Sequence, residues 1–278
     1  MPTATNAATA DFPALTRDLR VDIIRMIEAA GSGHPGGSLS IIDFLTVLYW
    51  KFLKHDPKRP DWPERDRLVL SKGHACPALY AVMAARGYFD KSLLSSLRRL
   101  GSPLQGHPDR LRLPGIEFSS GSLGQGLSAA LGMAYAAKLD GAPWKAYAVM
   151  GDGEMQEGQL WEAFMSAPKF GLGNLVAVVD HNGGQIDGPV REVMDLEPLA
   201  DKLAAFNWEV QTLDGHDFAA LEAALARAQK DGGRPHALIL KTIKGKGVSF
   251  MEGNIAWHGK APSKDEADKA VKEITDGR

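Results

Sequence analysis

The chain has almost no cysteine and almost no net charge. Cys76 is the only cysteine among 278 residues, which excludes a disulfide framework and a thiolate metal cluster and is typical of a reducing compartment. The 32 basic and 34 acidic residues give a net charge of −2, without a long run of either sign. This balance argues against nucleic acid or an anionic membrane as the main partner.

Long hydrophobic runs are also missing. No apolar stretch approaches the ~18 residues of a membrane span, and residues 1–10 are small and polar rather than apolar. We therefore expect a cytoplasmic protein without a membrane anchor. A hydrophobic content of 44% allows a substantial core. We expect an N-terminal arm over 1–14, one large domain over 15–262, and a polar, poorly ordered tail over 263–278.

Helical and strand patterns alternate along the chain. Apolar residues spaced three and four apart predict a helix from Leu15 to Ala30 that stops at Gly31, and Ser38 is the expected N-cap of a helix over 38–53. The other predicted strands and helices lie at 67–70, 77–86, 125–139, 146–150, 156–167, 175–180, 198–204, 208–213, 217–230 and 237–242. The alternation predicts an α/β fold, with a mainly parallel sheet and helices on both faces.

Two polar turns follow neighbouring predicted strands. Gly151-Asp152-Gly153 follows the strand at 146–150, and Asn182 comes directly after the strand at 175–180. Glycine turns at strand ends are where α/β folds bring backbone N–H groups against phosphate. A bare Asp152 carboxylate would repel a diphosphate, so we expect a divalent cation, Mg²⁺ or Ca²⁺, between them. Asn182 can supply a second oxygen ligand from roughly 5 Å away.

Four of the eight histidines stand beside a glycine, in loops or at helix starts. They are His34, His74, His107 and His258. Glycine lets backbone approach a ligand closely, so we expect these histidines to converge on one site. Zinc is excluded, because no two of them lie three to five residues apart and no cysteine supports them. Contacts to a hydroxylated or phosphorylated substrate, with proton transfer near neutral pH, suit them better.

Other groups carry weaker signals. The glycines of 121–126 open a helix and superficially resemble a dinucleotide loop, while the Gly-Lys-Ser/Thr of a nucleotide triphosphate loop is missing. The helix at 125–139 is rich in small residues, which suits either interior packing or a subunit contact. We expect Cys76 to be a small buried residue rather than a nucleophile. We expect structural roles for His55, His216 and His236, and leave His181 open.

Taken together, these motifs resemble transketolase. Gly-Asp-Gly followed by an Asn-containing loop is the signature of thiamine-diphosphate enzymes, and the surrounding segments match transketolase in order from about residue 15 to 262. The matching segments are Gly33-His34-Pro35-Gly36, Ser71-Lys72-Gly73-His74, the glycine-rich run 121–126, the Gly-Asp-Gly run 151–158, Gln185-Ile186-Asp187-Gly188, and 241–247. The resemblance covers the N-terminal, diphosphate-binding domain of that family.

The resemblance implies that thiamine diphosphate and a divalent cation are the cofactors. The cation would be bound by the side chains of Asp152 and Asn182 and by the carbonyl of Gly184. The diphosphate would contact the Gly153 N–H, His74 and His258. The backbone of Gly121 and Leu123 would meet the aminopyrimidine, and Ile186 and Ile243 would flank the thiazolium.

The resemblance also implies roles in catalysis and assembly. His34, His107 and His258 would contact the sugar and move its protons, and Glu157 would lie at a subunit contact in a carboxylate network. Two departures from the family pattern stand out. Gly183-Gly184 replaces bulkier residues in the metal loop. Gly121-Ser122-Leu123 replaces the Gly-Pro-Leu of single-chain transketolases and is similar to the two-subunit bacterial and archaeal form.

In this family, a glutamate from a second, pyrimidine-binding domain activates the cofactor. The predicted sheet uses the chain to about residue 245, which leaves no room for a second domain of ~150 residues. We therefore expect the N-terminal subunit of a split transketolase that acts on sugar phosphates. Its partner would be a separate C-terminal subunit of roughly 300 residues, in an α2β2 tetramer.

Three alternatives remain. The chain could serve a transketolase for an unusual sugar, such as a sulfonated one. It could be the α subunit of a 2-oxo acid dehydrogenase, although four loop histidines suit sugar hydroxyl groups better. It could also be a non-catalytic regulatory subunit that keeps the fold.

Overall fold

A computed structural model describes residues 10–230 and 232–277. Residues 1–9 of the expected N-terminal arm lie outside the described residues. Helix α1 (Phe12–Ala30) begins inside the span assigned to that arm, with the side chain of Asp11 as its N-cap. It ends at Gly31, which is left-handed with a φ of 64°, as the sequence predicts. A glycine adopts this conformation without the steric cost that a Cβ would add.

Five parallel strands form the central sheet, in the order β1-β2-β3-β7-β6. Their bounds are β1 (Arg67–Leu70), β2 (Ala146–Gly151), β3 (Leu175–His181), β6 (Glu209–Asp214) and β7 (His236–Lys241). The five predicted strands are therefore confirmed to within one residue at each end. A short antiparallel ribbon of β4 (Gly184–Gln185) and β5 (Gly188–Pro189) follows β3.

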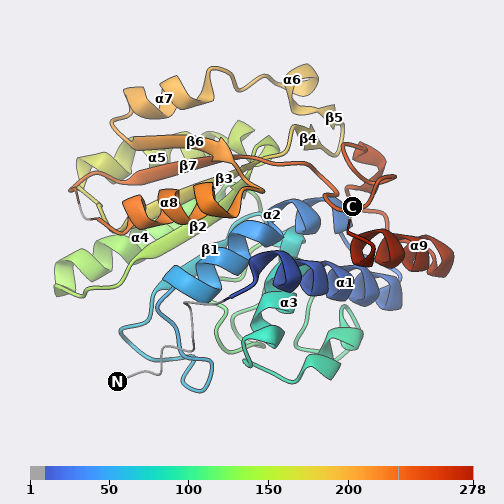
Figure 1. The fold of residues 1–278 in the computed structure, drawn as a ribbon. Coiled ribbons are helices and arrows are strands. Elements are labelled where there is room, and N and C mark those ends of the chain that lie inside the picture. The colour runs from blue at the N-terminus through green and yellow to red at the C-terminus, as the bar shows by residue number, and fades with distance from the viewer. Residues whose placement is uncertain (1–9, 231, 278) are drawn as a thin grey trace.

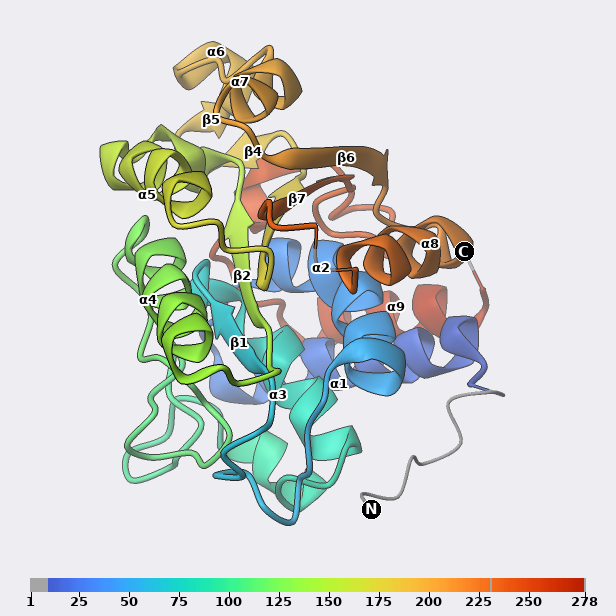
Figure 2. The ribbon, with the colours of Figure 1, turned by 90° about the vertical axis from the view of Figure 1, so that its left-hand side faces the viewer.

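Helices cover both faces of the sheet (Figures 1 and 2), which confirms the predicted fold class. Helices α4 (Gln125–Asp140), α5 (Gly158–Lys169) and α7 (Leu199–Ala205) share one core with alternate strand residues, including Ala148 and Val179. The opposite core takes the residues between them, such as Val149 and Val178. Its helices are α1, α2 (Pro35–Val47), α3 (Cys76–Ala85), α8 (Phe218–Ala228) and α9 (Lys264–Thr275). Burial of both strand faces explains the continuous apolar runs in the sequence.

Shorter helical segments lie between these elements. They are the π-helical turn Leu48–Phe52, the α-helical turn α6 (Val190–Val193) and the 3₁₀ segments Gly73–Ala75, Lys91–Ser96, Gly153–Gln156 and Ile255–Trp257. Pro168 lies in the last turn of α5, which ends one residue later. Proline has no backbone N–H to donate to the helix, which is consistent with the helix ending there.

The predicted N-cap of the second helix is wrong. Helix α2 begins at Pro35, with His34 at the N-cap position. The fixed φ of proline suits the first position of a helix, where its missing N–H costs nothing. Ser38 consequently lies in the first turn, where its Oγ donates a hydrogen bond to the carbonyl of His34 at 2.7 Å.

The expectation of a poorly ordered C-terminal tail is also wrong. Residues 264–275 form helix α9, whose capping box joins Ser263 and Glu266. The buried side chains of Ala267, Ala270 and Ile274 belong to the same core as α1. The segment looks polar because only one helical face is apolar, and that face is packed.

The register of the sheet brings three loops to one edge. Gly151 of β2 is level with Asp180 of β3, which is level with Leu240 of β7. The loops that follow these strands therefore begin side by side, at the edge that β4 and β5 mark in Figure 1. Carboxyl ends of parallel strands are where α/β sheets bind ligands.

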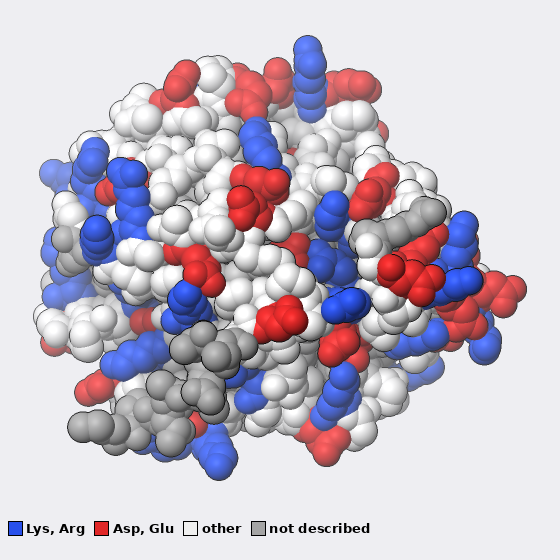
Figure 3. Space-filling model, in the orientation of Figure 1, with Lys and Arg blue, Asp and Glu red and all other residues white. Residues whose placement is uncertain are grey.

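The surface agrees with the balanced composition. On the face shown in Figure 3, basic and acidic side chains are interspersed rather than gathered by sign. In the described part of the chain, no helix has the length and hydropathy that a membrane span requires.

We expect Ile274→Ala in α9 to lower the free energy of unfolding by about 2–4 kcal/mol, because it removes buried methyl groups from a packed core. The matched control, Lys272→Ala, changes an exposed position of the same helix and should shift stability by less than about 0.5 kcal/mol. Urea unfolding followed by circular dichroism measures both. An Ile274→Ala variant as stable as the control would mean that α9 is not packed.

Candidate functional site

One cavity of about 350 Å³ lies at the carboxyl edge of the sheet, between the loops that follow β1, β2, β3 and β7. Twelve of the thirteen predicted site residues line it: His34, His74, His107, Gly121, Leu123, Asp152, Gly153, Glu157, Asn182, Gly184, Ile186 and His258. The exception is Ile243, although its neighbour Lys244 does line the cavity.

Asp152 and Asn182 meet at adjacent strand ends, as the sequence predicts. Asp152 is 1% exposed, and its two carboxylate oxygens accept hydrogen bonds from the N–H groups of Gly153 at 2.8 Å and Gly183 at 2.5 Å. Burial, together with the nearby charge of Asp180, raises the pKa of the Asp152 carboxyl. A cation beside Asp152 would relieve this cost.

A second buried acid, Asp180, organises the floor of the cavity. It is fully buried and accepts hydrogen bonds from four side chains, that of nearby Asn182 and those of Ser40, Lys72 and Thr242, which are distant in sequence. Burial alone would raise the pKa of Asp180, but its ion pair with Lys72 lowers it. Asn182 Nδ2 donates to Asp180 at 2.8 Å, and Asn182 Oδ1 accepts the N–H of Gly184 at 3.1 Å. An amide oxygen has two lone pairs, so Oδ1 could still act as a ligand.

Two buried lysines face these acids. Lys72 is 1% exposed and also donates to the carbonyl of Gly37 at 2.9 Å. Lys244 is 3% exposed, and its Nζ donates to the carbonyl of Gly184 at 3.0 Å. Burial and then the charge of Lys72 lower the pKa of Lys244 to about 8. Buried ammonium groups at the edge of a cavity favour an anionic ligand there.

Sequence reasoning assigned no role to either lysine. Lys72 and Lys244 both stand in segments that resemble transketolase, within glycine-rich loops. A lysine beside a predicted site histidine, as in Lys72-Gly73-His74, is the signal that could have identified the first.

Three of the predicted histidines pack against one another although they come from distant loops. The ring centroids of His34, His74 and His258 are separated by 5.1 to 5.5 Å. Burial is the largest cause that lowers the pKa of all three imidazoles. Burial and the charge of Arg98 lower the pKa of His34 to about 4. Burial and the charge of Lys244 lower the pKa of His258 to about 3. Neutral imidazoles can accept protons from a substrate and can donate through their remaining N–H.

His107 lies against the turn that begins at Gly121. A Cβ at Gly121, whose φ is +146°, would come within 3.2 Å of the His107 ring. Burial and then Arg98 lower the pKa of His107. Its imidazole therefore joins the cavity as a neutral group, beside the backbone of the 121–123 turn.

Glu154 joins three of the loops and was not identified from sequence. Its Oε1 accepts the N–H of Gly124 at 2.9 Å and the hydroxyl of Ser71, and its Oε2 accepts the N–H of Gly151 at 3.1 Å. Burial raises the pKa of Glu154, partly offset by these hydrogen bonds. The side chain is 3% exposed, and its hydrogen bonds connect the three loops.

Comparison with known proteins identifies this arrangement. Residues 13–275 match the family described as transketolase, thiamine diphosphate binding domain. The chain belongs to the transketolase family. It is 50% identical to the 6-deoxy-6-sulfo-D-fructose transketolase subunit SqwG of Clostridium sp. (strain MSTE9), over 88% of this chain and 89% of that protein. It is 41% identical to one of the subunits of the apulose-4-phosphate transketolase of Phocaeicola vulgatus, over 92% and 91%.

The fold agrees with the sequence comparison. The solved structure of transketolase from Leishmania mexicana superposes with a TM-score of 0.91 and 30% identity, and the match covers 96% of this chain. The same match covers 42% of the Leishmania chain, so this chain spans about two fifths of that transketolase. The matched part is the domain that the family description assigns to thiamine diphosphate.

The cavity suits the thiamine diphosphate and cation that the transketolase family implies. The Nδ1 of His258 is buried and, among the described residues, has no hydrogen-bond partner. A buried polar atom without a partner is open to a ligand or an ordered water, and this one lies in the cavity lining. Carboxylate, amide and carbonyl oxygens are the ligands that Mg²⁺ and Ca²⁺ prefer. In the described ranges, no group of three or more His, Cys, Asp or Glu side chains could hold a metal, so phosphate or water oxygens would complete the shell.

We expect stability to decrease between pH 6.5 and about 4 because His34 and His258 are neutral in the folded chain, with pKa values of about 4 and 3. Unfolded histidines have a pKa near 6.5, so in this window the unfolded chain binds protons that the folded chain does not. The free energy of unfolding therefore falls as the pH falls.

The fall in Tm from pH 7 to 4.5 should be smaller in a His34→Gln/His258→Gln variant. Asp152, whose raised pKa acts in the opposite direction, is common to both proteins and cancels in the comparison. An equal fall in variant and wild type would contradict this prediction.

Proposed function

We propose that this chain is the N-terminal subunit of a transketolase that transfers a two-carbon ketol unit from a ketose to an aldose by means of thiamine diphosphate. The observation that carries the proposal is the cavity in which a buried acid and an amide oxygen meet neutral histidines. Family membership and the match to proteins named as transketolase subunits support it. We further propose that activity requires a separate subunit with the pyrimidine domain.

Asp152, Asn182 and the Gly184 carbonyl would hold the cation, and His74, His258 and the Gly153 N–H would hold the diphosphate. Lys244, whose Nζ donates to the Gly184 carbonyl at 3.0 Å, would turn to the diphosphate when the cation takes that carbonyl. Thiamine diphosphate, when bound, supplies an electron sink for breaking a carbon–carbon bond next to a carbonyl group. A cation between Asp152 and the diphosphate would screen the repulsion between these two anions, and the buried ammonium groups of Lys72 and Lys244 would add to this effect.

The remaining site residues would position the cofactor and substrate. The backbone of Gly121 and Leu123 would contact the aminopyrimidine, and Ile186 would flank the thiazolium; all three residues line the cavity. Ile186 is 72% exposed, as expected for an apolar side chain that a ligand or a partner would cover. Ile243 is 39% exposed just outside the cavity lining, so its contact to the thiazolium would require a ligand that extends beyond the cavity.

Proton handling falls to the histidines. His34 and His258 are in ring contact, and both have a lowered pKa because of burial. As neutral imidazoles they can take the proton of a substrate hydroxyl as the carbon–carbon bond breaks, and return it to the new sugar. His107, on the opposite loop, would hold and orient a second hydroxyl group.

Several surface features support a partner subunit. Glu157 is exposed yet lines the cavity, so the site reaches the surface there. Helices α4 and α5, next to it, expose Leu139 by 69% and Met165 by 61%. Small residues of α4 such as Ala130 and Ala134 pack into the core, whereas Gly132 is exposed. We propose that this exposed side of α4 and α5 meets the partner chain, in an α2β2 assembly.

The sugar class has two candidates. A ketose phosphate is the donor implied by the resemblance to transketolase. A 6-sulfonated ketose is favoured by one specific observation, the 50% identity to a 6-deoxy-6-sulfo-D-fructose transketolase subunit over 88% of the chain. Both sugars are ketoses, so the two proposals share the same chemistry at the ketol end. They differ in the anionic group on the last carbon.

Asp152→Ala should abolish two-carbon transfer in the reconstituted complex, by about 100-fold or more, since the cation loses its charged ligand. Circular dichroism should show an intact fold. The matched control, Asp265→Ala, removes an exposed acid in the first turn of α9 and should keep wild-type rates. Activity of Asp152→Ala like that of the control at low Mg²⁺ would remove Asp152 from the metal site.

The purified chain alone should transfer no two-carbon units, and addition of its partner subunit should restore transfer. The physical reason is that the pyrimidine-domain glutamate is supplied in trans. Gel filtration should show co-elution, and the rate should be measured with D-fructose 6-phosphate and with 6-deoxy-6-sulfo-D-fructose as donors. The faster donor decides between the two sugar classes. A normal rate from the single chain would overturn the split-subunit proposal.

A further inference from the structure

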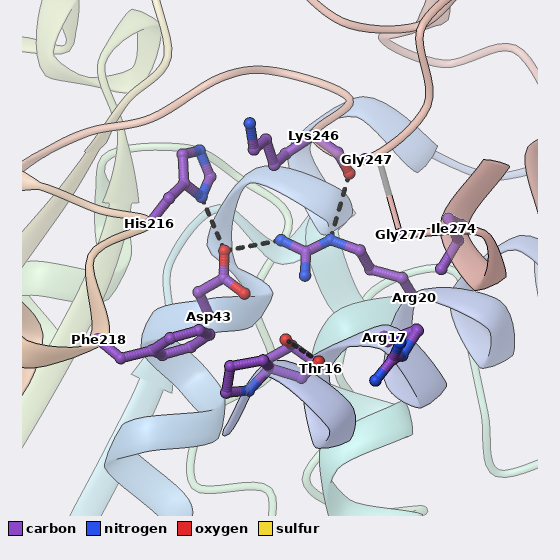
Figure 4. A pocket seen from close by; sticks show the side chains of 11 residues that line it. Thr16, Arg17, Arg20, Asp43, His216, Phe218, Lys246, Gly247, Ile274 and Gly277 are labelled. Atoms are coloured by element: carbon purple, nitrogen blue, oxygen red, sulfur yellow. Dashed lines mark hydrogen bonds and ion pairs between the residues drawn. The ribbon is translucent and has the colours of Figure 1, made fainter. Parts of the chain in front are cut away.

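A buried ionic network joins Arg20, Asp43 and His216, next to the segment that carries Lys246 and Gly247 (Figure 4). At its centre is Asp43 of α2, which is 2% exposed. One carboxylate oxygen, Oδ2, accepts hydrogen bonds from Arg20 Nη2 and from His216 Nδ1, each at 2.7 Å. Burial alone would raise the pKa of Asp43, but Arg20 and the His216 hydrogen bond lower it. The acid is therefore an anion in the folded chain.

Both side chains that bind Asp43 also form a hydrogen bond with the backbone of the loop 243–247. His216 Nε2 accepts the N–H of Ile243 at 2.9 Å, and Arg20 Nε donates to the carbonyl of Lys246 at 3.2 Å. The Ile243 bond requires Nε2 to be unprotonated, so the imidazole proton must be on Nδ1, which faces Asp43. The carboxylate thus selects the histidine tautomer that can bind the loop.

The two anchor points lie on either side of Lys244. Its Nζ reaches the Gly184 carbonyl at 3.0 Å, inside the candidate site. The middle of the loop is packed: Lys244 and Gly245 are buried, and the Gly245 N–H donates to the carbonyl of Gly36 at 3.0 Å. Lys246 and Gly247 are only partly buried and line a second cavity of about 280 Å³. The hydrogen bonds from His216 and Arg20 therefore act on Ile243 and Lys246, the residues on either side of the packed middle that burial holds least.

We propose that Asp43 is a positioning residue that acts through His216 and Arg20 to fix the loop 243–247, and with it the ammonium group of Lys244, in the cofactor cavity. The proposal rests on the proposed function for the identity of the ligand at Lys244. An ordinary structural ion pair would need only one partner for Asp43. Here two cationic or donor side chains from α1 and the 214–218 turn converge on one oxygen and both continue to the same loop.

The test removes one anchor while it preserves the ring volume: His216→Phe, in the complex with the partner subunit. The matched control is His236→Phe, which changes a buried histidine at the amino end of β7, at the end of the strands opposite the cavity. Asp43→Asn, which keeps the shape of the side chain but removes its charge, is the second variant if His216→Phe folds poorly.

Amide hydrogen exchange is the first measurement, and it needs no cofactor. Peptides over 242–251 should exchange about tenfold faster or more in His216→Phe than in wild type, while peptides over 237–240 of β7 keep their rates. The control should leave 242–251 unchanged. Wild-type exchange over 242–251 in both His216→Phe and Asp43→Asn would overturn the proposal.

Calorimetric titration with thiamine diphosphate and Mg²⁺ is the second measurement. Affinity should fall about tenfold in His216→Phe, with kcat at saturating cofactor nearly unchanged, and the control should bind like wild type. Faster exchange without loss of affinity would overturn the connection to Lys244. If wild type itself does not bind, the proposed function fails, and the exchange rates alone decide whether Asp43 anchors the loop.

Discussion

A fully buried carboxylate, Asp180, is the constraint on which the site depends. A buried charge is tolerated only when it is paired and hydrogen-bonded. Asp180 meets this requirement with side chains from α2, from the loop after β1, from its own strand end and from the loop after β7. These segments must therefore converge at one point. That convergence orients the Asn182 amide and places Lys72 against the cavity floor.

Two other buried acids connect separate segments in the same way. Glu154 ties together the loops at 71, 124 and 151, and Asp43 ties α1 and the 214–218 turn to the loop at 243–247. Each acid is buried and each bridges segments far apart in sequence. Hydrogen bonds to buried acids therefore connect these loops, in addition to apolar packing such as that of Val248 and Met251. Burial keeps the histidines of the cavity neutral, and a neutral imidazole can exchange protons with a sugar hydroxyl group.

Much of this was predictable from local pattern. All five strands and the glycine turn at Asp152 were identified from sequence, because buried parallel strands are continuous apolar runs and turns need glycine. The errors arose where local signals compete. Ser38 is a good N-cap residue, but Pro35 begins the helix earlier. The tail after Ser263 is polar on average, yet one apolar face of α9 packs on the core.

The sequence by itself determined the succession of strands and helices along the chain, the family, and that Asp152, four histidines and the glycine turns would meet at one end of the sheet. These follow from residue periodicity and short motifs, which are local. Only the tertiary structure decided which charges pair. Lys72 is 108 residues from Asp180, and His216 is 173 residues from Asp43. No local pattern encodes such pairs, because the energy of a buried ion pair depends on distance and desolvation in three dimensions.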